Sequence, residues 1–346
     1  MDTIVKTSSW LFVFVALLIA LFLANLWYGS VLIPWKEVLL ILTGSNNIQE
    51  VSKVIVIDYR LPQAITAIAV GISLGVAGLI LQTVFRNPLA GPSVLGVSSG
   101  ASLGVALVVF AGSIYHFDLL NSASLFHEVS IVSAALLGAL FVLAIIIFAS
   151  QRISNVVTIL IIGIMIGYTV SAIVGVIQFF SRAEELHAYI LWGLGSFSKT
   201  TVNQSIFLLL ASLIVTFVVF FYQKGLNALL LGDHYAKSIG VHVKKVQITL
   251  ILISGLLIAL GTVFTGPIAF VGLAIPHLAR NFFKTSDHRI LMPAVIVMGV
   301  TLTLACNLIA RLPGYDTSLP INAVTSLVGA PVIIWVIVKR GKVKRA

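Results

Sequence analysis

RNPLAGPSVLGVSSGASLGV, residues 86–105, joins a proline-broken loop to a glycine-spaced apolar segment. Pro88 and Pro92 disfavour helix in the first part, and they bias Asn87 and Gly91 toward extended backbone. Glycines then recur every fourth residue, at positions 96, 100 and 104. On a helix this spacing leaves a bare stripe that a second helix can approach closely. By itself the stretch predicts a turn followed by a closely packed helix.

The composition of the whole chain is that of a membrane protein. Of its 346 residues, 59% are hydrophobic and 9% are charged, whereas soluble domains carry about 25% charged residues. Long uncharged runs recur from end to end, and the mean hydropathy is +1.12. We therefore predict an all-α, polytopic helical bundle, a single transmembrane domain over residues 1–346.

The uncharged runs divide into about ten candidate transmembrane helices. Their expected ranges are about 9–33, 61–84, 93–112, 129–149, 156–180, 202–222, 246–265, 267–283, 291–310 and 321–338. Two further stretches are predicted to form short helices on the outer side, WKEVLLILTG at 35–44 and AEELHAYILWGLGS at 183–196;.

The basic residues indicate the orientation. With ten spans and a cytoplasmic N-terminus, most Lys and Arg residues fall in cytoplasmic loops and most acidic residues fall outside. Both termini are then cytoplasmic, and the C-terminal KRGKVKRA would contact anionic lipid. This distribution accounts for the net charge of +10 without a nucleic-acid partner.

Few residues in the chain could do chemistry. There is no GxxxxGK[ST] phosphate-binding loop and no HExxH zinc motif, and the single cysteine, Cys306, cannot form an internal disulfide;. His277 follows Pro276 and has no second metal ligand at helical spacing, so we interpret it as a hydrogen-bonded packing residue. The expected spans lack charges at mid-membrane depth, where ion-coupled carriers usually place them. The pattern favours a conduit powered by another protein; an ion-coupled secondary transporter and a membrane enzyme are the alternatives.

A second row of small residues lies in the fifth segment, at Gly163, Gly167, Ser171 and Gly175. Close helix packing within the membrane would explain this spacing. A smooth helix beside a pore, at a subunit interface that a bulky substrate passes, would explain it as well. A GxxxG pair in the second segment, at positions 71 and 75, needs only the packing explanation.

The loop over about 223–245 is the longest on the cytoplasmic side of this topology. It contains a short amphipathic run between Gly232 and Gly240. A solvated basic loop would satisfy the positive-inside rule. A short helix with a glycine at each end would instead dock a cytoplasmic partner, and the defined ends favour this second interpretation.

Two arginines, Arg60 and Arg311, stand in Arg-Leu-Pro triplets at expected outer ends of spans. Either side chain could extend to the lipid headgroups. The repeated triplet would also suit a docking site for an acidic partner.

Together these motifs resemble the permease subunits of binding-protein-dependent ABC importers for iron-siderophores, haem and cobalamin. The resemblance runs from about residue 60 to the C-terminus, and its longest matches are RNPLAGPSVLGVSSGA at 86–101, LLLGDHYAKSIGV at 229–241, GPIAFVGLAIPHLAR at 266–280 and LPINAVTSLVGAP at 319–331. It implies a multi-pass subunit in the cytoplasmic membrane of a prokaryote, paired with a second permease that is a copy of this chain or a related one.

The resemblance also implies two cytoplasmic ATPase subunits and a substrate-binding protein outside the membrane. The ATPase subunits would bind ATP and Mg, so no enzymatic activity, cofactor or metal is expected in this chain. The importer would carry an iron(III)-siderophore complex, or a chelate of the haem or cobalamin type.

Individual residues receive roles from the same resemblance. The element that couples to the ATPase matches Gly232, Asp233, Ala236, Lys237 and Gly240. The outer arginines that pair with glutamates of the binding protein match Arg60 and Arg311. Where the family often has a further Arg this chain has Gln63, so Lys53 is the expected substitute. The fifth segment matches the helix that lines the pathway, and the cytoplasmic gate matches Asn87 and Leu89, with Asn155 beside it.

Overall fold

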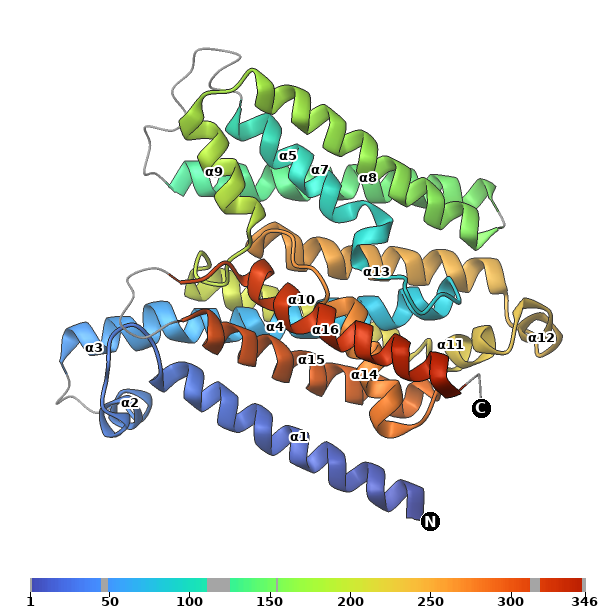
Figure 1. The fold of residues 1–346 in the computed structure, drawn as a ribbon, viewed down its shortest axis with the longest axis horizontal. Coiled ribbons are helices and arrows are strands. Elements are labelled where there is room, and N and C mark those ends of the chain that lie inside the picture. Colours follow the sequence, from blue (N-terminus) through green and yellow to red (C-terminus); the bar gives the residue numbers. More distant parts are fainter. Residues whose placement is uncertain (1, 45–48, 111–124, 154, 312–317, 344–346) are drawn as a thin grey trace.

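The computed structural model describes residues 2–44, 49–110, 125–153, 155–311 and 318–343, whose regular structure is helical throughout (Figure 1). The elements are α1 (Asp2–Trp27), α2 (Trp35–Leu42), α3 (Glu50–Val54), η1 (Ile55–Arg60), α4 (Leu61–Val84), η2 (Pro92–Leu95), α5 (Val97–Val109), α7 (Leu125–Arg152), α8 (Val156–Phe179), α9 (Ala183–Gly193), α10 (Val202–Phe220), α11 (Gln223–Leu230), α12 (Asp233–Ser238), α13 (Val243–Thr265), α14 (Val271–Phe283), α15 (His288–Ala310) and α16 (Ile321–Val343). Each of the ten predicted segments coincides with one of these helices, and the all-α class is confirmed.

Several of these helices can cross a membrane by their length and composition. Among the described residues, six continuous helical stretches are long and apolar enough: Glu50–Val84, Val129–Arg152, Val156–Phe179, Val202–Phe220, Val243–Thr265 and His288–Ala310. Shorter apolar helices lie at Phe12–Trp27, Val97–Val109 and Ile321–Ile334. The chain is thus a multi-pass membrane protein, while the count of about ten spans stays a prediction.

The helix at the centre of the bundle is α4, which packs on α15, α13, α10 and α14. A Cβ on Gly71 would lie 2.7 Å from the carbonyl oxygen of Gly299 in α15. A Cβ on Gly75 would lie 3.2 Å from a methyl carbon of Val295 in the same helix. Glycine therefore allows two spans to touch along this face, as the packing explanation of the pair predicted.

The glycine stripe of residues 86–105 serves two contacts. Gly100 and Gly104 face α7, where added Cβ atoms would lie 2.4 Å and 1.9 Å from the carbonyl oxygens of Gly138 and Ala134. Gly96 instead caps α5 with φ +71° and faces α8. The prediction of close packing is confirmed, and α5, α7 and α8 form a layer that joins the other helices through α13 and η2 (Figure 1).

Several predicted segment boundaries differ from the helix ends by more than three residues, and two of these differences have a clear local reason. The third segment was expected from about residue 93, but α5 begins at Val97, because η2 and the left-handed Gly96 come first. The first segment was expected to reach about residue 33, but α1 ends at Trp27, ahead of Gly29 and Pro34.

The two ends of the bundle carry different elements. The N-terminal end of α1, the C-terminal end of α16 and the short helix α12 lie at one end, on the right of Figure 1. The helices α2, α3 and α9 lie at the opposite end. The short helices predicted at 35–44 and 183–196 are therefore present, as α2 and α9, and the two chain ends share a side with α12.

Candidate functional site

The short helix α12 is bounded by glycines in the left-handed region of backbone space. Gly232, directly before it, has φ +108°, and Gly240, two residues after it, has φ +84°. A Cβ at either position would meet no atom of the described residues within 4 Å, so the backbone angle and not crowding favours glycine;. The predicted short helix with a glycine at each end is confirmed.

The side chains of α12 divide into a buried and an exposed set. Ala236 is fully buried, whereas Tyr235 and Ile239 expose 48% and 54% of their surface, and Lys237 is exposed beside them. Leu231, just before the helix, is also exposed. An apolar surface of this kind at the end of a bundle is what a docked protein would cover.

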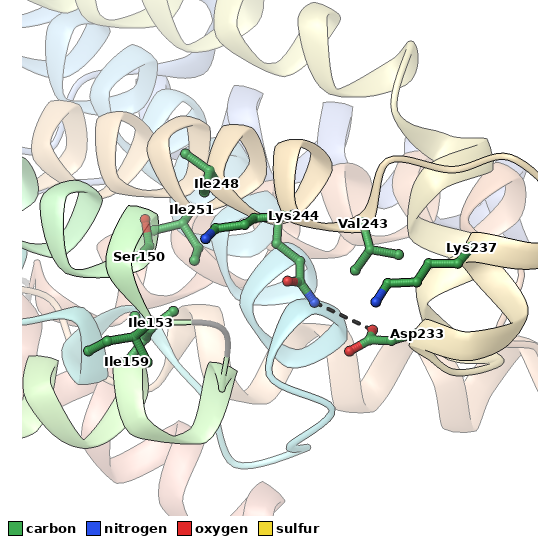
Figure 2. Close-up of a pocket in the computed structure, with 10 residues that line it drawn as sticks. Ser150, Ile153, Ile159, Asp233, Lys237, Val243, Lys244, Ile248 and Ile251 are labelled. Carbon is green, nitrogen blue, oxygen red and sulfur yellow. Dashed lines mark hydrogen bonds between the residues drawn. The ribbon is translucent and has the colours of Figure 1, made fainter.

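A cavity of about 150 Å³ lies beside α12 (Figure 2). Its lining includes Asp233 and Lys237 from α12, Lys244 from α13 and Ser150 from the end of α7. Asp233 Oδ1 also accepts a hydrogen bond of 3.5 Å from Nε2 of Gln247 in α13. The cavity separates α12 from the facing ends of α7 and α8, and α12 packs on α11 and α13 instead.

The loop between α4 and η2 carries the predicted gate residues. Asn87 Oδ1 accepts a hydrogen bond of 2.9 Å from the backbone N–H of Leu89, which folds a tight turn;. Leu89 is 52% exposed. The carbonyl oxygen of Pro88 lies 2.7 Å from Nε2 of His277 in α14. His277 is thus the hydrogen-bonded packing residue that the sequence predicted, and it holds this loop to α14; the gate role of the loop stays a prediction.

The third predicted gate residue, Asn155, caps the beginning of α8. Its Oδ1 accepts a hydrogen bond of 2.9 Å from the backbone N–H of Val157. The residue is exposed and precedes the first turn of α8. Its part in a gate stays a prediction, because the observed contact is a local helix cap.

The small residues of α8 fall into two groups. A Cβ on Gly163 would lie 2.3 Å from the carbonyl oxygen of Val94 in η2, and a Cβ on Gly167 would lie 3.4 Å from Oγ of Ser99. Ser171 and Gly175 are exposed, and a Cβ on Gly175 would meet nothing within 4 Å. Packing therefore explains the first half of the row, while the second half leaves a smooth face uncovered.

The outer arginine Arg60 is buried and directed into the protein. Only 4% of its surface is exposed, and its guanidinium donates to the carbonyl oxygens of Leu26, Trp27 and Val31. These carbonyls lie at and just beyond the C-terminal end of α1, where a cation is favoured. Arg60 thus joins η1 to α1 and does not extend to the headgroups; its docking role stays a prediction.

The second outer arginine, Arg311, keeps part of its guanidinium unbonded. Nη1 donates to the backbone oxygen of Asn25 at 2.8 Å, but Nε and Nη2 have no hydrogen-bond partner among the described residues. Burial, and then the nearby charge of Arg60, lower the pKa of Arg311 to about 10. Arg311 lines a small cavity that Gln63 and Ser196 also line. Lys53, the expected substitute cation, is exposed on α3.

Sequence reasoning missed a polar cluster that fixes α11. Oδ1 of Asn227 accepts a hydrogen bond of 2.9 Å from the backbone N–H of His288 and lies 2.7 Å from Nδ1 of the His288 ring. The other ring nitrogen of His288, Nε2, lies 2.9 Å from Oγ1 of Thr83. The cluster joins α11, α15 and α4. These residues are 61 and 205 positions apart in the chain, so no local sequence signal could reveal the cluster.

A second missed feature is a cavity of about 570 Å³. Asp58 and Tyr59 of η1 line it, together with Lys199 and Asn203 near the beginning of α10. The two groups of polar residues are more than 130 positions apart in the chain, so no sequence spacing predicted that they would meet.

Residues 96–100, GVSSG, have the GxSxG spacing of a hydrolase nucleophile turn;. That chemistry requires a strand before the serine, whereas Ser98 lies in the first turn of α5 after η2. Its hydroxyl lies 3.0 Å from Oγ1 of Thr262 in α13. Ser98 therefore joins two helices rather than forming a nucleophile site.

Relatives of known function align with 82% or more of the chain. Hemin transport system permease protein HmuU of Yersinia pestis is 35% identical over 287 residues, covering 82% of this chain and 83% of that protein. Vitamin B12 import system permease protein BtuC of Klebsiella pneumoniae is 30% identical over 338 residues, covering 97% and 96%. Molybdate import system permease protein MolB of Haemophilus influenzae is 32% identical over 287 residues, covering 82% and 81%.

A solved structure has the same fold. It is described as an inward-facing conformation of a metal-chelate type ABC transporter, is 28% identical to this chain, and aligns with a TM-score of 0.82 over 96% of this chain and 99% of that one. The family model of the FecCD transport family matches residues 17–339. Together with the helical fold and the glycine-bounded α12, these matches show that the chain belongs to the FecCD transport family as a permease subunit of an ABC importer.

Proposed function

We propose that this permease carries an iron(III)-siderophore complex, or a chelate of the haem or cobalamin type, across the cytoplasmic membrane of a prokaryote. Two permease subunits, two cytoplasmic ATPase subunits and an extracytoplasmic binding protein would form the importer. The observation that carries this proposal is α12, a defined six-residue helix with an exposed apolar face at the end of the bundle where both chain ends lie.

The ATPase would dock on α12. Its exposed Tyr235 and Ile239, with Leu231 beside them, offer an apolar contact, and Lys237 adds a positive charge. The glycines at 232 and 240 fix the direction in which the helix projects. ATP and Mg would be held by that partner, consistent with homologues that are transport subunits rather than enzymes.

A second permease would cover part of α8. Apolar side chains including Tyr168, Val176 and Phe179 are exposed along it, and the smooth surface at Ser171 and Gly175 lies on the same half of the helix. Lipid would cover such a helix as readily, but lipid does not require small residues. We infer that this half of α8 faces the partner permease, a copy of this chain or a related one, and borders the pathway.

The binding protein would dock at the opposite end and would have to reach Nε and Nη2 of Arg311, which are buried and have no hydrogen-bond partner among the described residues. These two donors form the edge of a guanidinium that binds a carboxylate through two parallel hydrogen bonds. A glutamate of the binding protein would satisfy both donors and offset the charge that burial disfavours. Arg60 has already committed its donors to α1, so Arg311 is the stronger candidate.

In the proposed cycle, ATP closes the ATPase pair, and α12 passes that motion into the spans. The two permeases then rock to open one side of the membrane or the other. Small, uncharged walls suit a large chelate that must not bind tightly during transit. The chain itself would form no bond to the substrate beyond transient contacts.

The substrate class can be tested with the binding protein that serves this permease. Titration of that protein with ferric siderophores, haem, cobalamin and molybdate should show tight binding of a chelate and none of molybdate. The relatives named above carry hemin, vitamin B12 and molybdate. Tight binding of molybdate alone would refute the proposed substrate and leave the importer assignment standing.

A further inference from the structure

We propose that Arg86 is a positioning residue that transmits the movement of α12 to the gate loop, residues 86–92. The inference rests on the proposed function of α12 as the ATPase contact. It assigns to a single side chain the step between ATPase motion and opening of the inner mouth.

The contacts of Arg86 span the two elements. Its Nη2 forms an ion pair with Oδ1 of Asp233, the first residue of α12. Its Nε donates a hydrogen bond of 3.1 Å to the carbonyl oxygen of Leu229 at the end of α11. The guanidinium therefore holds α12 and the preceding turn at once, while its backbone begins the gate loop.

The backbone of Arg86 supports a role for this side chain. Its φ is +46°, a left-handed angle that residues with a Cβ adopt at an energetic cost;. Glycine would satisfy that turn without cost. The arginine side chain adds the contacts with Asp233 and Leu229, which glycine could not make.

The far side of the gate loop is attached to the membrane helices. The carbonyl oxygen of Pro88 is bonded to His277 in α14. Beyond the loop, Val94 packs on Gly163 of α8 so closely that a Cβ there would lie 2.3 Å from its carbonyl oxygen. A displacement at Arg86 would thus be passed to α14 and α8 through these close contacts. Leu89 lies within the loop that would move.

The Arg86 contacts tie α12 directly to the gate loop, whereas the contact of α12 with α13 reaches the loop only through another helix. The cavity of about 150 Å³ separates α12 from α7 and α8 (Figure 2). α11 is held to α15 and α4 by the Asn227 and His288 cluster. A hinge between a fixed α11 and a mobile α12 would fall at Gly232, and Arg86 bridges that hinge.

The ion pair itself should contribute little to stability. Its side chains are 40% and 38% exposed, and exposed pairs are weak because water screens them. Variants that lack the pair are therefore expected to fold and to assemble. If the pair were structural, its loss would prevent assembly with the ATPase subunits. If Arg86 is a positioning residue, the complex assembles but the gate no longer responds to the nucleotide state.

The test uses the complete complex with its ATPase subunits, in which Leu89→Cys reports on the gate and Cys306→Ser removes the native thiol. A membrane-impermeant maleimide is applied from the cytoplasmic side, without nucleotide and after vanadate trapping. In the parent complex the labelling rate should differ between the two states by about fivefold or more, the range of a typical coupling between two sites. Arg86→Met and Asp233→Asn should each reduce that ratio to about one. The double variant should give the same ratio as each single variant, because both changes remove the same interaction.

Lys284→Met is the matched control, because Lys284 is another basic residue with positive φ at a helix end and is exposed. It should leave the labelling ratio unchanged. The inference is overturned if the Arg86 and Asp233 variants keep the parent ratio, or if they lose the ATPase subunits, since Asp233 would then hold the dock. If the ATPase subunits do not copurify with the parent chain, or cannot be cross-linked to a cysteine in place of Tyr235, the proposed function itself fails.

Discussion

Replacing Gly163 by alanine should destabilise the protein, because η2 leaves no room for a methyl group there. A Cβ at this position would lie 2.3 Å from the carbonyl oxygen of Val94 and 3.1 Å from Cα of Leu95. Ordinary contact begins at 3.4 Å, so the carbonyl would have to retreat by about 1.1 Å. Both opposing atoms belong to the backbone, which cannot turn aside as a flexible side chain can.

Gly175 in the same helix supplies the matched control, since a Cβ there would meet nothing within 4 Å. Each Gly→Ala change gains about 1 kcal/mol of helix propensity, and this gain cancels between the two variants. The remaining difference is the cost of overpacking at Gly163, about 1–3 kcal/mol. In the isolated subunit, where no partner permease covers α8, Gly175→Ala should equal or exceed the wild-type stability.

The assay is thermal unfolding of the two purified variants in the same detergent. Gly163→Ala should melt several degrees below Gly175→Ala, with the wild type between them or close to the latter. Equal melting temperatures, or a higher one for Gly163→Ala, would refute the close approach of η2 to α8. That result would also remove the last step of the path from Arg86 to α8.

Three further predictions address coupling, docking and pH. Gly240→Leu forces a side chain into φ +84°, at a cost of about 1–2 kcal/mol, and should stop substrate-driven ATP hydrolysis while the subunit stays in the membrane; normal stimulation would contradict the coupling role. Arg311→Glu should abolish capture of the binding protein in a pull-down, and Lys53→Glu should weaken capture less. Arg60→Glu should chiefly lower the melting temperature. Unchanged capture by Arg311→Glu would count against docking at Arg311. The carboxylate of Asp287 accepts a hydrogen bond from a backbone N–H in the first turn of α15, which holds its pKa below the ordinary value. The stabilisation from the ionised carboxylate is complete above the unfolded-state pKa of about 3.9 and is lost as pH falls through the lower folded-state pKa. Acid should therefore lower the melting temperature of the wild type more than that of Asp287→Asn. Parallel curves of melting temperature against pH for the two proteins would contradict this.

Local chemistry made parts of the structure predictable. The glycines at 232 and 240 mark both ends of α12, because a helix stop depends on neighbouring backbone angles alone. The stripe at Gly100 and Gly104 predicted a close helix contact, because four-residue spacing places small residues on one face. Neither pattern could identify the partner helix, since the choice of α7 depends on residues thirty or more positions away.

The outer arginines show where sequence reasoning fails. The triplets at Arg60 and Arg311 look alike, yet the guanidinium of Arg60 donates to carbonyls at and just beyond the end of α1. That of Arg311 has two donors without a partner among the described residues. The difference depends on how α1 lies against η1 and α15, and this is a property of tertiary packing. The Arg86–Asp233 pair was hidden for the same reason, because 147 residues separate its members.

The central claim is that this permease works by ATP hydrolysis in a separate subunit, and uptake into liposomes tests it most directly. Vesicles would hold the permease with its ATPase subunits, with the binding protein and its identified chelate outside and ATP trapped inside. The account predicts uptake that requires ATP and the binding protein and that continues when ionophores collapse every ion gradient. Uptake that persists without ATP and stops with an ionophore would contradict the account and identify the chain as an ion-coupled transporter.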